Sequence, residues 1–430
     1  MVMNRWRQLI RPYKLFPLVP EGVTMRRKKK KRIFPLICML FLCVLLCIAG
    51  TVTAAKLYLQ KLPEAAKITQ EVVDQIVENT VPFAEITIDE TEVAGGYYYQ
   101  LLSDGQQLVY KEILQGIRNQ AESIYIHCAT ANEFGRIYEY LLYDRPEVFW
   151  CTGKTQITSY SDYSEVRPGY ICQGEELVRR SAEIDAAANA CLAGISLEAP
   201  EYDKIKYVFE YLVNTVDYNM DAPDNQNIYS ALVNKASVCA GYSRAAQYLL
   251  QRLGIECIYV VGSIPEQGPH AWNIVKCNGQ YYQMDVTFGD PVFFQGESGV
   301  NIPLDSINYG YLCCTDTDMY RSHTPDPEVY YPECVSMDLN YYVLNGMYYD
   351  VYDRDLILQN MNQSVYAMQS AFTCKFPDEG LYQQAHDDVI QQLIPQAAQN
   401  LAVYYGLETV WYTYVEDPKM AAITVYWGYQ

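Results

Sequence analysis

A cysteine, a histidine and an aspartate with the potential for acyl-transfer chemistry occur in one part of the chain, at Cys239, His270 and Asp285. A thiolate is a strong nucleophile, and an imidazole can take and return its proton. A carboxylate orients the imidazole and stabilises its charged form. If the fold brings these three side chains together, they could attack an amide carbonyl through a thioester. The elements around each residue must therefore be considered first.

Cys239 lies where a helix is predicted to begin, in the stretch SVCAGYSRA at residues 237–245. Ser237 is the expected N-cap, and Gly254 is placed to end the helix. The first turn of a helix carries free N–H groups and a partial positive charge, which favour a thiolate. The backbone N–H of Cys239 is also placed to stabilise an oxyanion. One face of this helix is apolar, comprising Tyr242, Ala246, Leu249, Leu250 and Leu253.

His270 and Asp285 lie on either side of Asn278-Gly279, a strong two-residue hairpin signal. A turn of that length sets His270 diagonal to Asp285 on one face of the sheet. Diagonal neighbours lie about 7–8 Å apart, close enough for an imidazole and a carboxylate to meet. The turn therefore predicts a His–Asp dyad, although Asp285 capping a turn is an alternative. Packing the helix of Cys239 on this sheet would complete a triad.

Three blocks resemble the core of the transglutaminase-like superfamily: VCAGYSRAAQYLLQRLGIECIYVVG, HAWNIVK and YYQMDVTFGDP. The resemblance covers about residues 200–295 and matches Cys239, His270 and Asp285 to the superfamily's catalytic residues in order and type. It implies an α+β fold with a papain-like core, in which the helix bearing the cysteine packs on an antiparallel sheet bearing the histidine and aspartate. The flanking regions resemble extensions of membrane-anchored members from Gram-positive bacteria.

Three aromatic residues are candidates for the substrate cleft: Tyr229, Tyr242 and Trp272. Tyr229 is the one suggestion for a second oxyanion donor. Trp272 has two interpretations, since it can pack beside the site or line the cleft.

The other three histidines, His127, His323 and His386, are expected on the surface. The first has no partner nearby in the sequence, the second lies in a Ser/Thr/Pro/Asp loop, and the third lies among acids on a helix.

The cysteine pattern indicates neither a structural metal nor a redox site. Of 14 cysteines, three lie in an apolar run near the N-terminus. The other eleven are an odd number, so at least one is unpaired or pairs with another chain. No CxxC motif and no Cys/His cluster at zinc spacing occurs, so neither a metal nor an organic cofactor is expected.

Charge and hydropathy predict a membrane anchor at the N-terminus. Residues 26–32 are all Lys or Arg, and the uncharged run 33–55 is long enough to span a bilayer. Basic residues before a span hold that end in the cytoplasm, so the remainder is expected outside the plasma membrane. A cleaved signal peptide is the competing interpretation, and translation from Met25 is a further one. Residues 33–430 carry a net charge of −29, which disfavours nucleic-acid binding.

The predicted organisation follows from these segments. The hydrophobic pattern predicts helices over 174–193 and 201–219, a strand over 160–172, a hairpin turning at Asn345-Gly346 and strands near the C-terminus. The predicted regions are a basic tail at 1–32, a transmembrane signal anchor at 33–55, a stalk at 56–82, an accessory helix-and-strand region at 83–195, the transglutaminase-like core at 196–330 and an α+β extension at 331–430.

The expected function is that of an extracytoplasmic cysteine enzyme acting on a peptide or glutamine-type amide. The acyl acceptor stays open between water (protease or amidase) and an amine (cross-linking). The expected partners are a peptide or protein substrate, such as a cell-wall peptide, and the membrane through one helix. The alternative is a catalytically silent surface module that binds wall peptides or a partner protein.

Overall fold

The computed structural model describes residues 82–290 and 306–429. The predicted tail, anchor and nearly all of the stalk lie outside these residues. Within 82–290 and 306–429, no helix has the length and apolar character needed to cross a bilayer.

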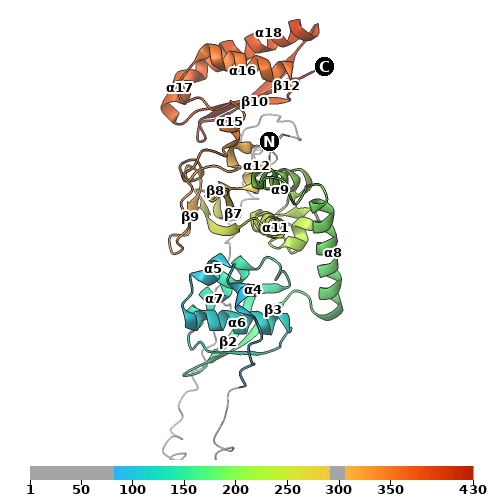
Figure 1. Ribbon diagram of the computed structural model, residues 1–430, viewed down its shortest axis with the longest axis vertical. Coiled ribbons are helices and arrows are strands. Elements are labelled where there is room, and N and C mark those ends of the chain that lie inside the picture. Colours follow the sequence, from blue (N-terminus) through green and yellow to red (C-terminus); the bar gives the residue numbers. More distant parts are fainter. Residues whose placement is uncertain (1–81, 291–305, 430) are drawn as a thin grey trace, which may run out of the picture.

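Three regions follow one another along the long axis of the molecule (Figure 1). The region that comes first in the sequence, called the N-terminal region below, has a three-stranded sheet in the order β1-β3-β2 and four helices. Its elements are α4 (Glu90–Val93), α5 (Tyr97–Gln100), α6 (Asp104–Arg118), β1 (Ile124–Ile126), α7 (Ala131–Asp144), β2 (Cys151–Ser159) and β3 (Ser164–Tyr170). The predicted strand at 160–172 corresponds to β3.

The central region is built on an antiparallel sheet in the order β8-β7-β6-β9. Its helices are α8 (Gly174–Leu192), α9 (Glu201–Thr215), α10 (Ile228–Leu232), α11 (Cys239–Arg252), α12 (Val286–Gly289) and α14 (Asp316–Met319), with a 3-10 turn, η1 (Tyr309–Tyr311). Its strands are β4 (Asp217–Tyr218), β5 (Ala236–Ser237), β6 (Cys257–Ile264), β7 (Gly268–Cys277), β8 (Gln280–Met284) and β9 (Thr324–Pro325). The predicted helix at 174–193 is confirmed as α8. The one predicted at 201–219 is confirmed as α9 up to Thr215, but Asp217–Tyr218 form β4.

Strands β6 and β7 are buried on both faces, because alternate residues enter two different apolar clusters. Ile258 and Trp272 pack with the N-terminal region, and Cys257 and Val275 pack with α8, α9 and α11. The Tyr98 hydroxyl also donates to the Tyr259 carbonyl at 2.6 Å. The N-terminal region therefore covers one face of the sheet, and α11 covers the other.

The C-terminal region has its own apolar core around a sheet in the order β10-β12-β11. Its elements are α15 (Tyr341–Leu344), α16 (Arg354–Tyr366), β10 (Ala371–Lys375), α17 (Glu379–Asp388), the π-helical turn η2 (Val389–Leu393), α18 (Ile394–Tyr405), β11 (Trp411–Asp417) and β12 (Ala422–Gly428). The predicted strands near the C-terminus are confirmed as the pair β11 and β12.

The predicted hairpin at Asn345-Gly346 is wrong. The Asn340 side chain accepts from the N–H groups of Tyr342 and Val343 and so begins the short helix α15. Asn345 is the C-cap of this helix, and Gly346 follows with a φ of +66°. An Asn-Gly pair ends a helix as readily as it forms a hairpin turn, because both uses need the left-handed region.

Candidate active site

Cys239 is the first residue of α11, as predicted, but the N-cap is Val238. The Ser237 hydroxyl is hydrogen-bonded to Ser230 and donates to the Asn225 carbonyl, so it does not cap the helix. This hydroxyl lies so close to Gly241 that a Cβ there would be 1.9 Å from it. Gly241 therefore allows the preceding loop to pack tightly against the first turn of α11.

Two hydrogen bonds hold α11 against β7 one turn beyond Cys239. The Ser243 hydroxyl donates to the Ala271 carbonyl at 2.9 Å, and the Asn273 amide donates to the Ser243 carbonyl at 3.0 Å. Because Ala271 adjoins His270, these bonds fix the helix start relative to the imidazole.

The Asn278-Gly279 turn forms the predicted hairpin, with Cys277 paired with Gln280. The ladder ends at Met284, so Asp285 directly follows β8. The His270 Nε2 lies 2.6 Å from the Asp285 Oδ2, and both side chains are almost completely buried.

Asp285 has both of the roles that the sequence presented as alternatives. Its Oδ1 accepts from the N–H groups of Thr287 at 2.8 Å and Phe288 at 3.2 Å, capping α12. Its Oδ2 accepts from His270. Helix capping therefore orients the carboxylate that faces the imidazole.

The charges in this group depend on one another. Burial alone would lower the pKa of His270, but the Asp285 carboxylate and the Cys239 sulfur, through charge and hydrogen bonding, raise it to about 10. Burial alone would raise the pKa of Asp285, but the charge on His270 and the hydrogen bonds from two histidines hold it well below its usual range. The site therefore favours an imidazolium next to an ionised carboxylate.

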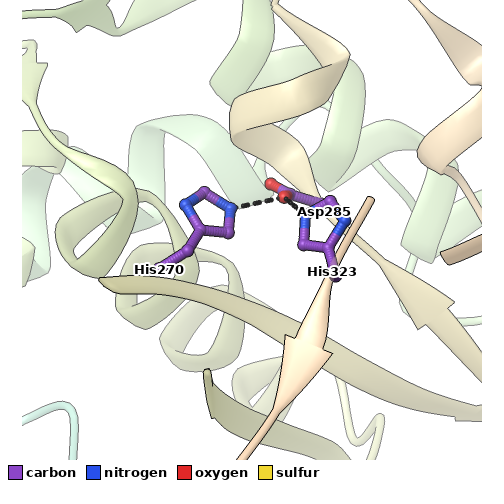
Figure 2. A group of neighbouring side chains, drawn as sticks. All are labelled: His270, Asp285 and His323. Carbon is purple, nitrogen blue, oxygen red and sulfur yellow. Dashed lines mark hydrogen bonds and ion pairs between the residues drawn. The ribbon is translucent and has the colours of Figure 1, made fainter. Parts of the chain in front are cut away.

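The expectation that His323 lies on the surface is wrong. Only 2 % of His323 is exposed, and its Nε2 lies 2.9 Å from the Asp285 Oδ2 (Figure 2). It immediately precedes β9, which pairs with β6 at Gly262 and Ser263. A Cβ at Gly262 would lie 2.2 Å from the Thr324 carbonyl oxygen, so the glycine admits this close approach. The sequence offered one weak signal, since the residue before Pro325 favours an extended backbone.

The other two histidines lie near the surface, as expected, but both have acidic partners. His127 is bound to the buried Glu112 through its ring and its backbone N–H. His386 is paired with Asp387 and Glu416.

The cleft candidates are mostly buried in the core. Tyr242 and Trp272 have no exposed surface, and they bind Val216 and Gln283 respectively. Tyr229 directs its hydroxyl at Glu183 on α8, 2.7 Å away. The hydroxyl and indole groups of all three are bonded within the protein, and their place in a substrate cleft stays a prediction.

A cavity of about 1100 Å³ lies between the central and C-terminal regions. Its lining includes Phe288, Tyr311 and Ser322, which adjoin the histidines, but neither Cys239 nor His270. This cavity is therefore not lined by the candidate nucleophile or its base.

Within residues 82–290 and 306–429, one group of side chains has the spacing of a metal site: His270, Asp285 and His323, whose three possible ligand atoms lie within 4.8 Å of one another. Both histidines use the Nε2 atom in a hydrogen bond to the same carboxylate oxygen. A nitrogen that donates a proton has no lone pair for a metal, so this arrangement is that of a hydrogen-bonded cluster.

All eleven cysteines among the described residues are buried and unpaired. Among these eleven, Cys239 is distinguished by its place as the first residue of a helix, α11, that packs on the strand of His270.

Residues 190–286 match a family described as the transglutaminase-like superfamily, so the chain contains a domain of that type. The match includes Cys239, His270 and Asp285. A comparison with curated proteins found no match.

Solved structures similar to this chain include a TGase (17% identity, TM-score 0.24, 38% of this chain and 50% of that one). A protein from Cytophaga hutchinsonii designated a candidate cysteine protease has 14% identity and a TM-score of 0.23 over 32% of this chain and 63% of that one. Menin, whose structure shows a binding site for the Mixed Lineage Leukemia protein, has 16% identity and a TM-score of 0.22 over 54% and 56%. The chain spans less than two thirds of each, and scores this low do not establish a common fold.

Proposed function

We propose that this protein is a cysteine enzyme that acts on a peptide or glutamine-type amide through Cys239, His270 and Asp285. The observation that carries the proposal is the buried pair of His270 and Asp285, whose Nε2 and Oδ2 atoms lie 2.6 Å apart. The helix α11, which begins at Cys239, is hydrogen-bonded to the same strand at Ala271, the neighbour of His270. The match of residues 190–286 to the transglutaminase-like superfamily supports the proposal.

In the proposed reaction, Cys239 and His270 each act once when the thioester forms and once when it is broken down. The Cys239 sulfur attacks the amide carbonyl, and a carbon–sulfur bond forms. The carbon–nitrogen bond then breaks as the His270 imidazolium gives its proton to the leaving amine, which leaves a thioester. Water or a second amine loses a proton to His270 and attacks the thioester, and the sulfur leaves. Asp285 stays ionised throughout and holds His270 in place.

The acceptor of the acyl group determines which kind of enzyme the protein is. Attack by water makes the protein a protease or amidase, and attack by an amine makes it a cross-linking enzyme. We also propose that residues 33–55 anchor the protein in the plasma membrane, with the described regions outside, where a cell-wall peptide is a reachable substrate.

The alternative is a silent binding module, and one observation favours it. Cys239 exposes 7 % of its surface and His270 5 %, so little of the candidate machinery meets solvent. An enzyme must admit substrate to this sulfur, whereas a binding module need not.

Two experiments separate these functions. Iodoacetamide treatment at mildly acidic pH, read by peptide mass spectrometry, should modify Cys239 fastest of the eleven described cysteines; equal or slower modification favours the binding module. Incubation with a peptide-amide library, with and without added amine, should release ammonia or amine and yield acid or cross-linked product. C239A and H270A should each abolish this turnover, and full activity in either variant contradicts the triad.

A further inference from the structure

His323 is a buried histidine that the three-residue mechanism does not use. Its side chain is fully enclosed, and its ring centre lies 4.8 Å from that of Phe288 and 5.1 Å from that of Trp272. Its two nitrogens are both engaged, Nε2 with the Asp285 Oδ2 at 2.9 Å and Nδ1 with the Ser322 hydroxyl at 2.8 Å. A buried polar ring surrounded by aromatic groups needs these two hydrogen bonds to satisfy its nitrogen atoms.

The partners determine where the protons lie on His323. An ionised carboxylate only accepts hydrogen bonds, so the Nε2 atom must carry a hydrogen. Burial lowers the pKa of His323, which favours the neutral ring despite the opposing pull of Asp285. In a neutral ring protonated at Nε2, the Nδ1 atom accepts, and the Ser322 hydroxyl donates to it.

Asp285 thereby receives four donors. Two backbone N–H groups bind its Oδ1, while His270 and His323 both bind its Oδ2. The two backbone N–H groups fix Oδ1. Without a further donor on its other side, Oδ2 could still turn away from His270. His323 adds that donor without adding charge.

We propose that His323, held by Ser322, is a positioning residue that fixes the Asp285 carboxylate for its work on His270. This inference rests on the proposed function, because it assigns His323 a part in the same proton chemistry. The role requires that His323 act through Asp285 and that the effect depend on a donor at the Nε2 position.

A double-mutant cycle tests the route of action, with the rate of Cys239 alkylation in the full chain as the readout. H323F removes the donor but keeps a flat ring, and H323Q places an amide N–H near the position of Nε2. We expect H323F to slow alkylation about tenfold, and the rate of H323Q to stay within about threefold of the wild-type rate. In the D285N background, H323F should change the rate less than about twofold. Additive losses from H323F and D285N, or an H323Q variant as slow as H323F, overturn the proposal.

Nuclear magnetic resonance of the wild-type chain tests the proton positions directly, and variants serve only to assign its signals. With only four histidines in the chain, ¹⁵N-labelled ring signals can be assigned by single substitutions. We expect His323 to be neutral and protonated at Nε2 at pH 7, and to stay so when zinc is added. A charged ring, a proton on Nδ1 alone, or joint zinc-induced shifts of His270 and His323 overturn the proposal.

Neither readout requires turnover, so the two proposals can fail separately. A chain that shows the expected cycle and tautomer but converts no amide refutes the enzyme and leaves the positioning role intact. A chain that converts amides and shows additive losses refutes the positioning role alone.

Discussion

Replacing Asp285 with asparagine should reduce the reactivity of Cys239 about a hundredfold. The pKa of His270 is about 10 instead of its ordinary 6.5, which corresponds to roughly 5 kcal/mol of stabilisation of the imidazolium at about 1.4 kcal/mol per tenfold change in ionisation. The Asp285 charge is the largest favourable contribution to this shift. If it supplies half, D285N removes roughly 2–3 kcal/mol, or about a factor of 10² in the ratio of the ion pair to the neutral thiol and imidazole.

The substitution leaves the local backbone supported. The asparagine oxygen can still accept from Thr287 and Phe288, so the cap of α12 persists. Its amide N–H₂ would instead face the Nε2–H groups of His270 and His323, where donor meets donor. The substitution should therefore weaken the stabilisation of the His270 imidazolium and leave the cap of α12 intact.

The assay is the second-order rate of iodoacetamide modification at Cys239 at pH 7, measured by mass spectrometry. D144N is the matched control, because Asp144 is a buried carboxylate that accepts from the N–H groups of Tyr98 and Tyr99, far along the chain from the site. D144N should leave the rate unchanged. A folded D285N chain that reacts within about twofold of the wild type would show that the carboxylate does not support the sulfur, and the reasoning would fail.

Three further predictions concern the supports of the site. Because the pKa of His270 is raised in the folded protein, the charged ring stabilises the fold fully below pH 6.5, and this contribution is lost as the pH rises towards about 10. In urea titrations, the free energy of unfolding of the wild type should fall by about 1.4 kcal/mol per pH unit in that window relative to H270N. A stability difference between the two proteins that grows with pH contradicts this. S243A removes the hydroxyl bond to Ala271 and should cost about 1 kcal/mol in urea while slowing alkylation of Cys239 several-fold; an unchanged rate would show that this bond does not set the helix position. G262A forces a Cβ against the Thr324 carbonyl and should destabilise the fold by about 1–3 kcal/mol in the same titrations, whereas a neutral effect would mean that β9 moves aside freely.

The central part of the fold could be predicted because its signals are local. The Asn-Gly turn between two apolar strands determines the register of β7 and β8 as far as Asn273 and Met284. Asp285 lies beyond this ladder as the N-cap of α12, so the two side chains meet as predicted but not as diagonal neighbours on the sheet. The periodic apolar face of α11 likewise predicts both the helix and its contact with the sheet. In these elements, the information lies within a few residues of the feature that it determines.

His323 could not be predicted because its position depends on a long-range contact. Strand β9 has two residues, which is too short for any alternation of apolar and polar side chains. The strand is held by pairing with β6, far earlier in the chain, and by the absence of a side chain at Gly262. Polar neighbours in the sequence indicated a surface loop, while the tertiary contacts buried the ring.

Asp285 shows why local alternatives are not always exclusive. A carboxylate has two oxygens and about four acceptor positions, so capping a helix with one oxygen leaves the other for an imidazole. In this protein the cap supplies part of the rigidity of the dyad, because the two N–H groups of α12 hold Oδ1 while His270 binds Oδ2. A glutamate at this position would reach farther but lose the cap geometry, since N-caps favour the shorter side chain. The choice of aspartate therefore serves structure and proton chemistry through the same group.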